Sequence, residues 1–162
     1  MKKYQVGIIG ATGMVGQRFA TLLENHPWFE VKALAASGSS AGKTYEEAVG
    51  ERWAMSTPMP ESMKEMIIFD AAADVEKVAS LVDFVFCAVN MNKDEIKALE
   101  EAYAKAECPV MSNNSANRGT PDVPMIIPEI NADHAAVIEA QRKRLGTKRG
   151  FISVKSNCSL QS

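Results

Sequence analysis

Cysteines are scarce in this sequence and are not spaced as metal ligands. The chain of 162 residues contains three, Cys87, Cys108 and Cys158, and no two of them form a Cys-x-x-Cys pair. Both the odd number and the spacing disfavour a disulfide framework and a structural zinc site. We therefore predict no metal site, and we expect reduced thiols in a cytoplasmic protein.

Strong charge of one sign and long apolar runs are also missing. Eighteen Lys and Arg against twenty Asp and Glu give a formal net charge of -2, so no overall field attracts nucleic acid or an anionic membrane. No apolar run approaches the roughly 20 residues that span a bilayer, and glycines interrupt the run after Lys2 and Lys3 before an export signal forms. The sequence, 46% hydrophobic, instead suits one domain with a buried core and without nucleic-acid or membrane partners.

The most informative stretch is an apolar run, residues 6–9, that stops in three spaced glycines. Gly10, Gly13 and Gly16 form Gly-x-x-Gly-x-x-Gly, and the residues after them continue with helical periodicity. Glycines here permit a sharp turn, close approach of a diphosphate and tight packing of helix on strand, with the diphosphate at the helix N-terminus. Residues 31–36 follow as a second strand, which favours a dinucleotide-binding βαβ unit. A plain strand-to-helix turn is the alternative.

The rest of the chain continues to alternate strands with helices. Asn92, followed three residues later by Glu95, is typical of a helix start. The predicted strands cover residues 66–69, 84–89, 108–111 and 151–154, and the predicted helices cover 45–50, 75–81, a segment after Asn92, and 131–145. We predict an α/β fold with a Rossmann-like, doubly wound, mainly parallel sheet of about six strands. Residues 1–155 form the dinucleotide-binding domain in this interpretation, and 156–162 begin a catalytic segment.

The loop after the second strand bears on the choice of coenzyme. An NAD site usually has an acidic residue there, which accepts from the ribose 2′-hydroxyl, whereas this strand ends in Ala35 and Ala36. The loop offers Ser37, Ser40 and Lys43 instead, which could bind a 2′-phosphate. A solvated Ser/Gly loop would have the same composition.

Two further segments follow the ends of predicted strands and carry reactive or polar groups. Residues 112–118 include Asn113 and Arg118, which could hold a phosphate or carboxylate or belong to a capped polar turn. Cys158 follows the last strand at an expected helix start, where unpaired N–H groups stabilise a thiolate; a small residue at a helix start is the alternative. Cys87 is expected to be a core residue, and His26 and His134 are expected to be structural.

Taken together, these segments resemble the aspartate-semialdehyde dehydrogenase family. The resemblance covers essentially the whole chain and rests on residues 10–16, 36–43, 112–118, 123–124 with 128–131, and 156–159. It implies reversible, NADPH-dependent reduction of L-aspartyl 4-phosphate to L-aspartate 4-semialdehyde and phosphate, on the route to lysine, threonine and methionine. It also implies that Cys158 is the nucleophile, that Arg118 and Asn113 hold the phosphate or the acyl phosphate, and that the coenzyme contacts Gly10, Thr12, Gly13, Met14, Val15, Ser37 and Ser40.

The sequence departs from the family pattern in two ways. Many members carry arginine in the Ser-x-Arg-Ser loop, where this chain has Ser39, so NADP preference should be modest. The family's second domain, which supplies the catalytic histidine, a glutamine and the dimer contacts of a homo-oligomer, is not present, and Gln161 lies too close to Cys158 to replace that glutamine. The chain is therefore expected to be inactive alone.

Three alternatives to this function differ in chemistry. A malonyl-CoA reductase of the same family would use the same cysteine and NADPH on a CoA thioester. A non-catalytic dinucleotide-binding module would bind coenzyme without a reactive thiol. An N-acetylglutamyl phosphate reductase is disfavoured, because its cysteine motif usually reads Asn-Pro-Gly-Cys rather than Ser-Asn-Cys-Ser.

Overall fold

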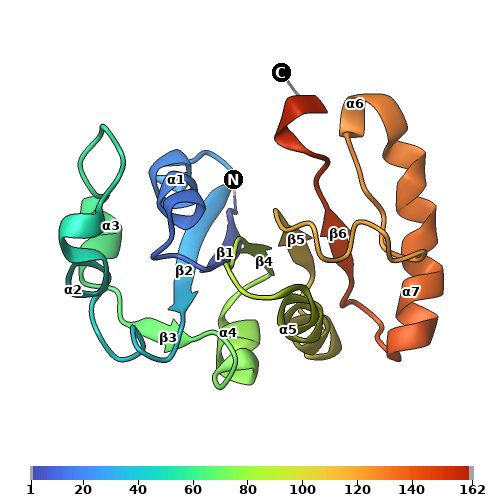
Figure 1. Cartoon of the computed structure of the whole chain (residues 1–162), viewed down its shortest axis with the longest axis horizontal. Coiled ribbons are helices and arrows are strands. Elements are labelled where there is room, and N and C mark those ends of the chain that lie inside the picture. The colour runs from blue at the N-terminus through green and yellow to red at the C-terminus, as the bar shows by residue number, and fades with distance from the viewer. Residues whose placement is uncertain (1, 161–162) are drawn as a thin grey trace.

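The centre of the fold is a parallel sheet of six strands. The computed structural model describes residues 2–160. Its strands lie in the order β3-β2-β1-β4-β5-β6, and each neighbouring pair is parallel (Figure 1). Their bounds are β1 Tyr4–Ile9, β2 Phe29–Ala36, β3 Ile68–Asp70, β4 Phe84–Cys87, β5 Val110–Ser112 and β6 Ile152–Val154. The predicted Rossmann-like α/β fold is confirmed.

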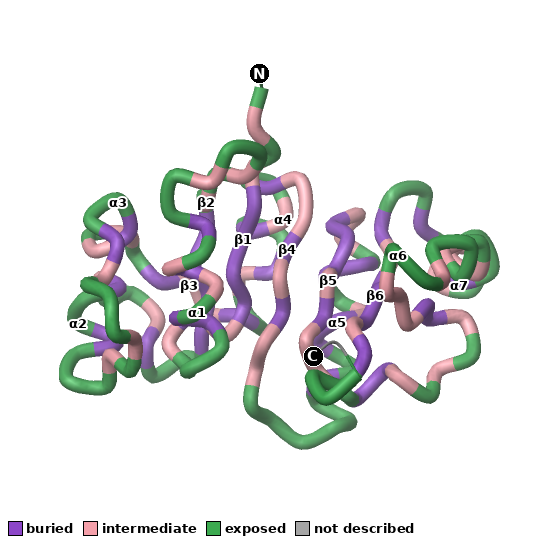
Figure 2. The backbone as a smooth tube through the Cα atoms, turned by 90° about the horizontal axis from the view of Figure 1, so that it is seen from above, coloured by how far each residue is buried: buried purple, intermediate pink, exposed green. Residues whose placement is uncertain are grey.

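Helices cover both faces of the sheet. Helices α1 (Met14–Leu23), α2 (Tyr45–Val49) and α3 (Glu61–Lys64) lie on one face, and α4 (Val75–Leu81) and α5 (Lys93–Lys105) lie on the other (Figure 1). A 3-10 turn, Gly50–Arg52, follows α2. Each face buries its own hydrophobic cluster, and Figure 2 shows the buried residues concentrated along the strands. Apolar residues therefore fill both sides of the strands, as burial on both faces requires.

Local sequence explains where several elements begin. In α1, the buried residues Gly16, Gln17, Ala20 and Leu23 recur at helical spacing and face the sheet. Thr44 and Glu47 form a reciprocal capping box at the start of α2. The side chain of Asn92 accepts a hydrogen bond from the Glu95 N–H at 2.9 Å, which confirms the predicted start of α5.

The helix predicted over residues 131–145 is not continuous. The structure has a short helix α6 (Pro128–Asn131), a 3-10 segment (Ala132–Val137) and then α7 (Ile138–Leu145). The Asn131 side chain accepts from the Ile127 N–H and donates to the Met125 carbonyl, and its own φ is -139°. These side-chain bonds to the backbone compete with a regular helix, so the continuous α-helix was a wrong prediction.

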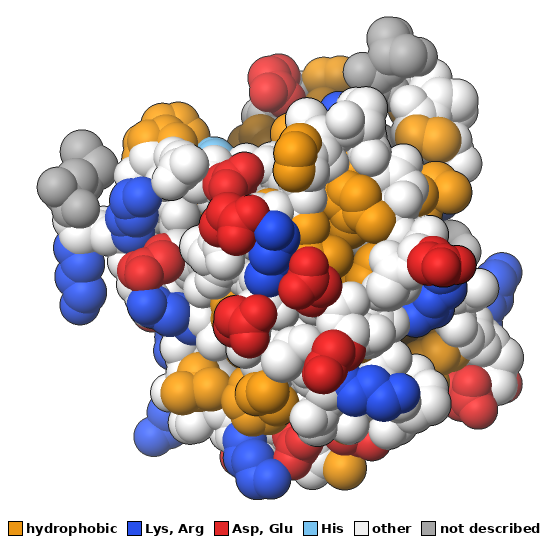
Figure 3. Space-filling view, turned by 90° about the vertical axis from the view of Figure 1, so that its left-hand side faces the viewer, with side chains coloured by type: hydrophobic (Ala, Val, Ile, Leu, Met, Phe, Trp, Pro, Cys, Tyr) orange, Lys and Arg blue, Asp and Glu red, His pale blue; other side chains and the backbone are white. Residues whose placement is uncertain are grey.

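The side of the molecule formed by α2 and α3 carries charges of both signs. Figure 3 shows acidic and basic side chains interspersed there, with hydrophobic atoms exposed between them. This matches the near balance of charge in the sequence. Within residues 2–160, none of the helices has the length and apolar character needed to span a bilayer.

Candidate functional site

The glycine turn between β1 and α1 depends on two of its glycines for shape. Gly10 has a φ of +88°, and a Cβ there would lie 2.4 Å from the Ala88 carbonyl oxygen. A Cβ on Gly16 would lie 2.1 Å from the Gly10 carbonyl oxygen. A side chain at either position would therefore displace backbone, whereas a Cβ on Gly13 would meet that same oxygen at an ordinary 3.6 Å. Contacts within the protein therefore do not require glycine at position 13. Close approach of a ligand remains the predicted reason for glycine there.

Two buried side chains hold the peptide groups of this turn. The Tyr45 hydroxyl donates to the Ala11 carbonyl at 2.9 Å, and the Gln17 amide donates to the Thr12 carbonyl at 3.0 Å. Burial raises the pKa of Tyr45, so its hydroxyl keeps the proton that it donates. Because a trans peptide points its C=O and N–H in opposite directions, the Thr12 N–H faces away from Tyr45. The turn therefore leaves the Thr12 N–H available at the start of α1, where a diphosphate is favoured.

A cavity of about 470 Å³ opens beside this turn. Its walls include Gly10, Thr12, Gly13, Ser37 and Gly38, together with residues that follow β3 and β4. These walls bring together most of the predicted coenzyme residues.

The other predicted coenzyme residues lie elsewhere. Met14 and Val15 are exposed at the start of α1 and do not line the cavity. Ser40 is buried, and it is instead the Ser37 and Ser39 hydroxyls that lie 3.0 Å apart on the exposed loop. The exposed hydroxyls of this loop are therefore those of Ser37 and Ser39.

One residue of this cavity was missed by the sequence analysis. Asp70 ends β3 and lines the cavity, directly beside Ala36 in the register of β2 and β3. No acidic residue ends β2, whereas Asp70 ends the neighbouring β3. An acidic residue at the end of the third predicted strand is the sequence feature that indicates Asp70.

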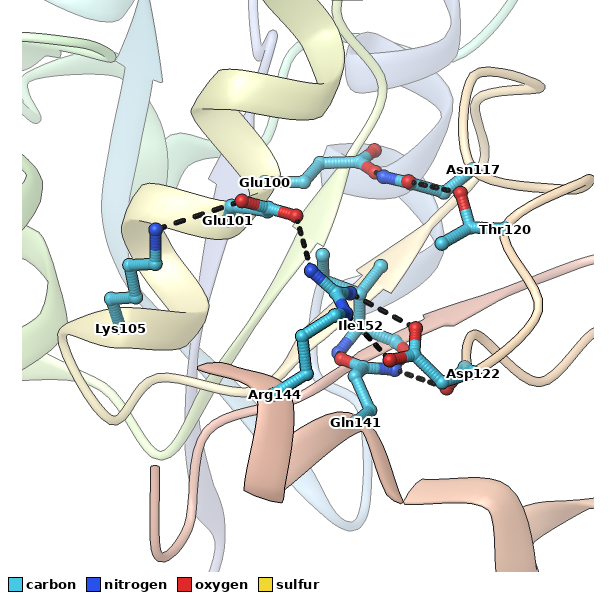
Figure 4. Close-up of polar contacts among 9 residues, drawn as sticks. All are labelled: Glu100, Glu101, Lys105, Asn117, Thr120, Asp122, Gln141, Arg144 and Ile152. Carbon is cyan, nitrogen blue, oxygen red and sulfur yellow. Dashed lines mark hydrogen bonds and ion pairs between the residues drawn. The ribbon is translucent and has the colours of Figure 1, made fainter. Parts of the chain in front are cut away.

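The polar loop after β5 is held by a buried carboxylate that the sequence analysis also missed. Glu100 on α5 is fully buried and accepts hydrogen bonds from the Ser112 hydroxyl and from the Asn114 and Asn117 amides. Figure 4 shows the Glu100–Asn117 contact continuing to Thr120. Since buried polar groups without partners are costly, this network fixes the course of residues 112–117.

The same region is joined to the end of the sheet by α7. Gln141, fully buried, donates to the Asp122 and Ile152 carbonyls and accepts from the Ile152 N–H. Arg144 pairs with Asp122 through two nitrogens, at 2.5 and 2.9 Å, and with Glu101 at 2.8 Å (Figure 4). Paired, planar contacts of this kind fix orientation as well as distance.

Arg118 links the polar loop to the segment that carries the cysteine. Its Nε donates to the Lys155 carbonyl at 3.2 Å and its Nη2 donates to the Ser156 carbonyl at 3.4 Å. Arg118 therefore lies beside the backbone that leads to Cys158. Asn113 instead lines a second, mainly apolar cavity of about 590 Å³, beside Lys155 and residues of β6.

The three cysteines differ sharply in their surroundings. Cys158 is exposed and begins a 3-10 turn, Cys158–Leu160, while its neighbour Asn157 accepts from the Ser159 N–H. Cys87 and Cys108 are each 1% exposed. Burial raises the pKa of the Cys87 thiol, and it raises that of Cys108 to about 12. Cys87 is a core residue, as predicted, and Gln161 lies outside the described residues.

Within residues 2–160, the hydrogen bonds and ring contacts of the two histidines lie outside the segment that carries Cys158. The His26 ring stacks on Phe29 with centroids 4.7 Å apart and accepts from backbone N–H groups. His134 lies 3.3 Å from the Met125 carbonyl. In the described part of the chain, no group of three or more His, Cys, Asp or Glu could hold a metal ion.

Comparison with known proteins of similar sequence identifies the family of this chain. Residues 5–138 match the family model described as semialdehyde dehydrogenase, NAD binding domain. The chain is 42% identical over 158 residues to an aspartate-semialdehyde dehydrogenase of Aspergillus fumigatus, covering 98% of this chain and 42% of that protein. It is 44% identical over 154 residues to that of Methanothermobacter thermautotrophicus, covering 95% of this chain and 42% of that protein.

The fold of a solved relative agrees. The crystal structure of aspartate-semialdehyde dehydrogenase with NADP from Candida albicans matches with a TM-score of 0.82 and 35% identity, covering 98% of this chain and 44% of that one. The chain thus spans about 42% of the length of the two curated relatives above. It belongs to the semialdehyde dehydrogenase family, and it corresponds to the NAD(P)-binding N-terminal portion of aspartate-semialdehyde dehydrogenases.

Proposed function

We propose that this chain is the NADP-binding, cysteine-bearing part of an enzyme that converts L-aspartyl 4-phosphate to L-aspartate 4-semialdehyde. The observation that supports it best is the contact between Arg118 and the backbone that leads to Cys158. This contact brings a guanidinium group beside the segment that carries an exposed thiol, at one edge of a coenzyme-binding fold. The two relatives above carry the name of this activity.

The proposed reaction assigns one role to each group. The Cys158 thiolate attacks the acyl carbon, the bond from carbon to the phosphate oxygen breaks, and phosphate leaves to give a thioester. A bound reduced coenzyme supplies the hydride that reduces this thioester; the carbon–sulfur bond then breaks to release the aldehyde and the thiolate. Arg118 has five N–H donors, and its two backbone bonds leave others for the phosphate.

Acylation of the thiol tests this function directly. We expect acetyl phosphate, a simple acyl phosphate, to add one acetyl group to Cys158, and we expect Cys158→Ser to remain unmodified. Intact-mass and peptide-mapping spectrometry would detect the added group. Acylation by malonyl-CoA but not by acyl phosphates would favour the CoA-dependent alternative, and a thiol inert to both would favour a binding module.

The choice of coenzyme gives a second prediction. The Ser37 and Ser39 hydroxyls can donate to a 2′-phosphate, and no acidic residue ends β2. We expect NADPH to bind more tightly than NADH by about 1–2 kcal/mol, the scale of hydrogen bonds to a charged group. Calorimetric titration measures both constants, and the Ser37→Ala, Ser39→Ala double variant should narrow the difference. Equal dissociation constants in the unmodified chain would contradict this assignment.

A further inference from the structure

Asp70 gives the coenzyme cavity its charge. Among the described residues that line this cavity it is the only charged one. The chain has the fold of an NAD(P)-binding domain, and such a dinucleotide is itself anionic. A carboxylate in its cavity is unfavourable unless it faces a hydrogen-bond donor of the ligand. Asp70 therefore needs a hydrogen-bond donor on the ligand that can face its carboxylate.

The Asp70 side chain is already fixed by one of its two oxygens. Oδ1 accepts from the Ala72 and Ala73 N–H groups, both at 2.9 Å. Oδ2 lies 2.8 Å from the place that a Cβ on Gly38 would occupy. Within residues 2–160 no hydrogen bond to Oδ2 is found. One oxygen thus holds the local turn, and the other remains available.

The order of the strands indicates which part of the ligand lies opposite Asp70. In this fold class, the diphosphate lies at the glycine turn after β1 and the adenosine ribose lies at the end of β2. The adenine base is the next group along the ligand, and β3 is the next strand along the sheet. Asp70 is the last residue of β3 and pairs in register with Ala36 at the end of β2. The adenosine end of the ligand, whose base carries an amino donor, therefore lies opposite Asp70.

We propose that Asp70 selects adenine by accepting a hydrogen bond from its 6-amino group at Oδ2. The 6-amino group is the exocyclic donor of the base, and a 6-oxo base presents an acceptor at the same place. Asp70 Oδ2 and a 6-oxo oxygen would both be acceptors, and neither would have a donor. An unpaired polar group of this kind gives strong discrimination between a 6-amino and a 6-oxo base. This inference rests on the coenzyme site of the proposed function but not on its cysteine chemistry.

Titration with two coenzymes that differ only at this group tests the inference. The probes are NADPH and reduced nicotinamide hypoxanthine dinucleotide phosphate, in which oxygen replaces the 6-amino group. The unmodified chain should bind NADPH at least about tenfold more tightly. In Asp70→Asn the ratio should fall to about one or reverse, because an amide N–H at Oδ2 can donate to the 6-oxo group. The asparagine oxygen at Oδ1 still accepts from Ala72 and Ala73, so the melting temperature should change little.

A matched variant separates this contact from simple loss of charge. Glu76→Gln removes one negative charge from the exposed start of α4, and it should leave the ratio of the two constants unchanged. A ratio near one in the unmodified chain, or a ratio unaffected by Asp70→Asn, would overturn the inference while leaving the proposed function in place. Failure of both coenzymes to bind would contradict the site itself and the inference with it.

Discussion

Gly10→Ala is expected to lower the free energy of unfolding by more than about 3 kcal/mol and to weaken NADPH binding more than about a hundredfold. Two costs combine at this position. The φ of +88° disfavours any residue with a Cβ, and the added Cβ would lie 2.4 Å from the Ala88 carbonyl oxygen. The displaced backbone belongs to the turn and to the strand end that line the coenzyme cavity. Urea denaturation and calorimetric titration measure the two effects.

Gly42→Ala is the matched control for this prediction. Gly42 also has a positive φ, +81°, but a Cβ there would meet no atom within 4 Å. Only the backbone strain of about 1–2 kcal/mol should be seen, and NADPH affinity should be preserved. If the two variants behaved alike, close packing at the turn would not be the reason for glycine at position 10.

Brief alkylation near neutral pH is expected to label Cys158 at least about a hundredfold faster than the other two cysteines. Cys158 is exposed, whereas Cys87 and Cys108 are each 1% exposed. With a pKa of about 12, Cys108 is ionised in fewer than about one molecule in 10,000 at pH 7.5. Both buried thiols should therefore stay unreactive up to about pH 9 while the chain is folded. Peptide mapping after substoichiometric iodoacetamide identifies the labelled residue.

The control for this prediction is Cys158→Ser. This variant should take up label only after denaturation, when both buried cysteines become accessible. Labelling of Cys87 or Cys108 ahead of Cys158 in the folded chain would contradict the assignment of Cys158 as the available nucleophile.

The features predictable from sequence were those encoded locally. Spaced glycines after an apolar run indicated the turn at Gly10, because the requirement for a missing Cβ lies within a few residues. Alternating apolar runs and helical patterns indicated the parallel sheet, and Asn92 with Glu95 marked a helix start. In each case the sequence pattern and the structure involve the same short segment.

Features that depend on neighbours distant in the chain were missed. Asp70 lines the coenzyme cavity only because β3 lies beside β2, which is a property of strand order. In the sequence, Glu100 cannot be distinguished from other helix residues. Its role depends on α5 packing against the loop after β5, where Glu100 accepts from Ser112 and Asn117. Similarly, the burial of Ser40 and the Ser37–Ser39 contact depend on how the loop turns back on itself.

The most direct test of the account is a calorimetric titration of the 162-residue chain with NADPH, because coenzyme binding at the glycine turn is its central claim. We expect saturable binding at one site per chain, competed by ADP-ribose, which carries the diphosphate but no nicotinamide. Binding should be lost in Gly10→Ala under conditions where that variant is still folded by circular dichroism. No saturable binding, or binding that Gly10→Ala leaves intact, would contradict the account.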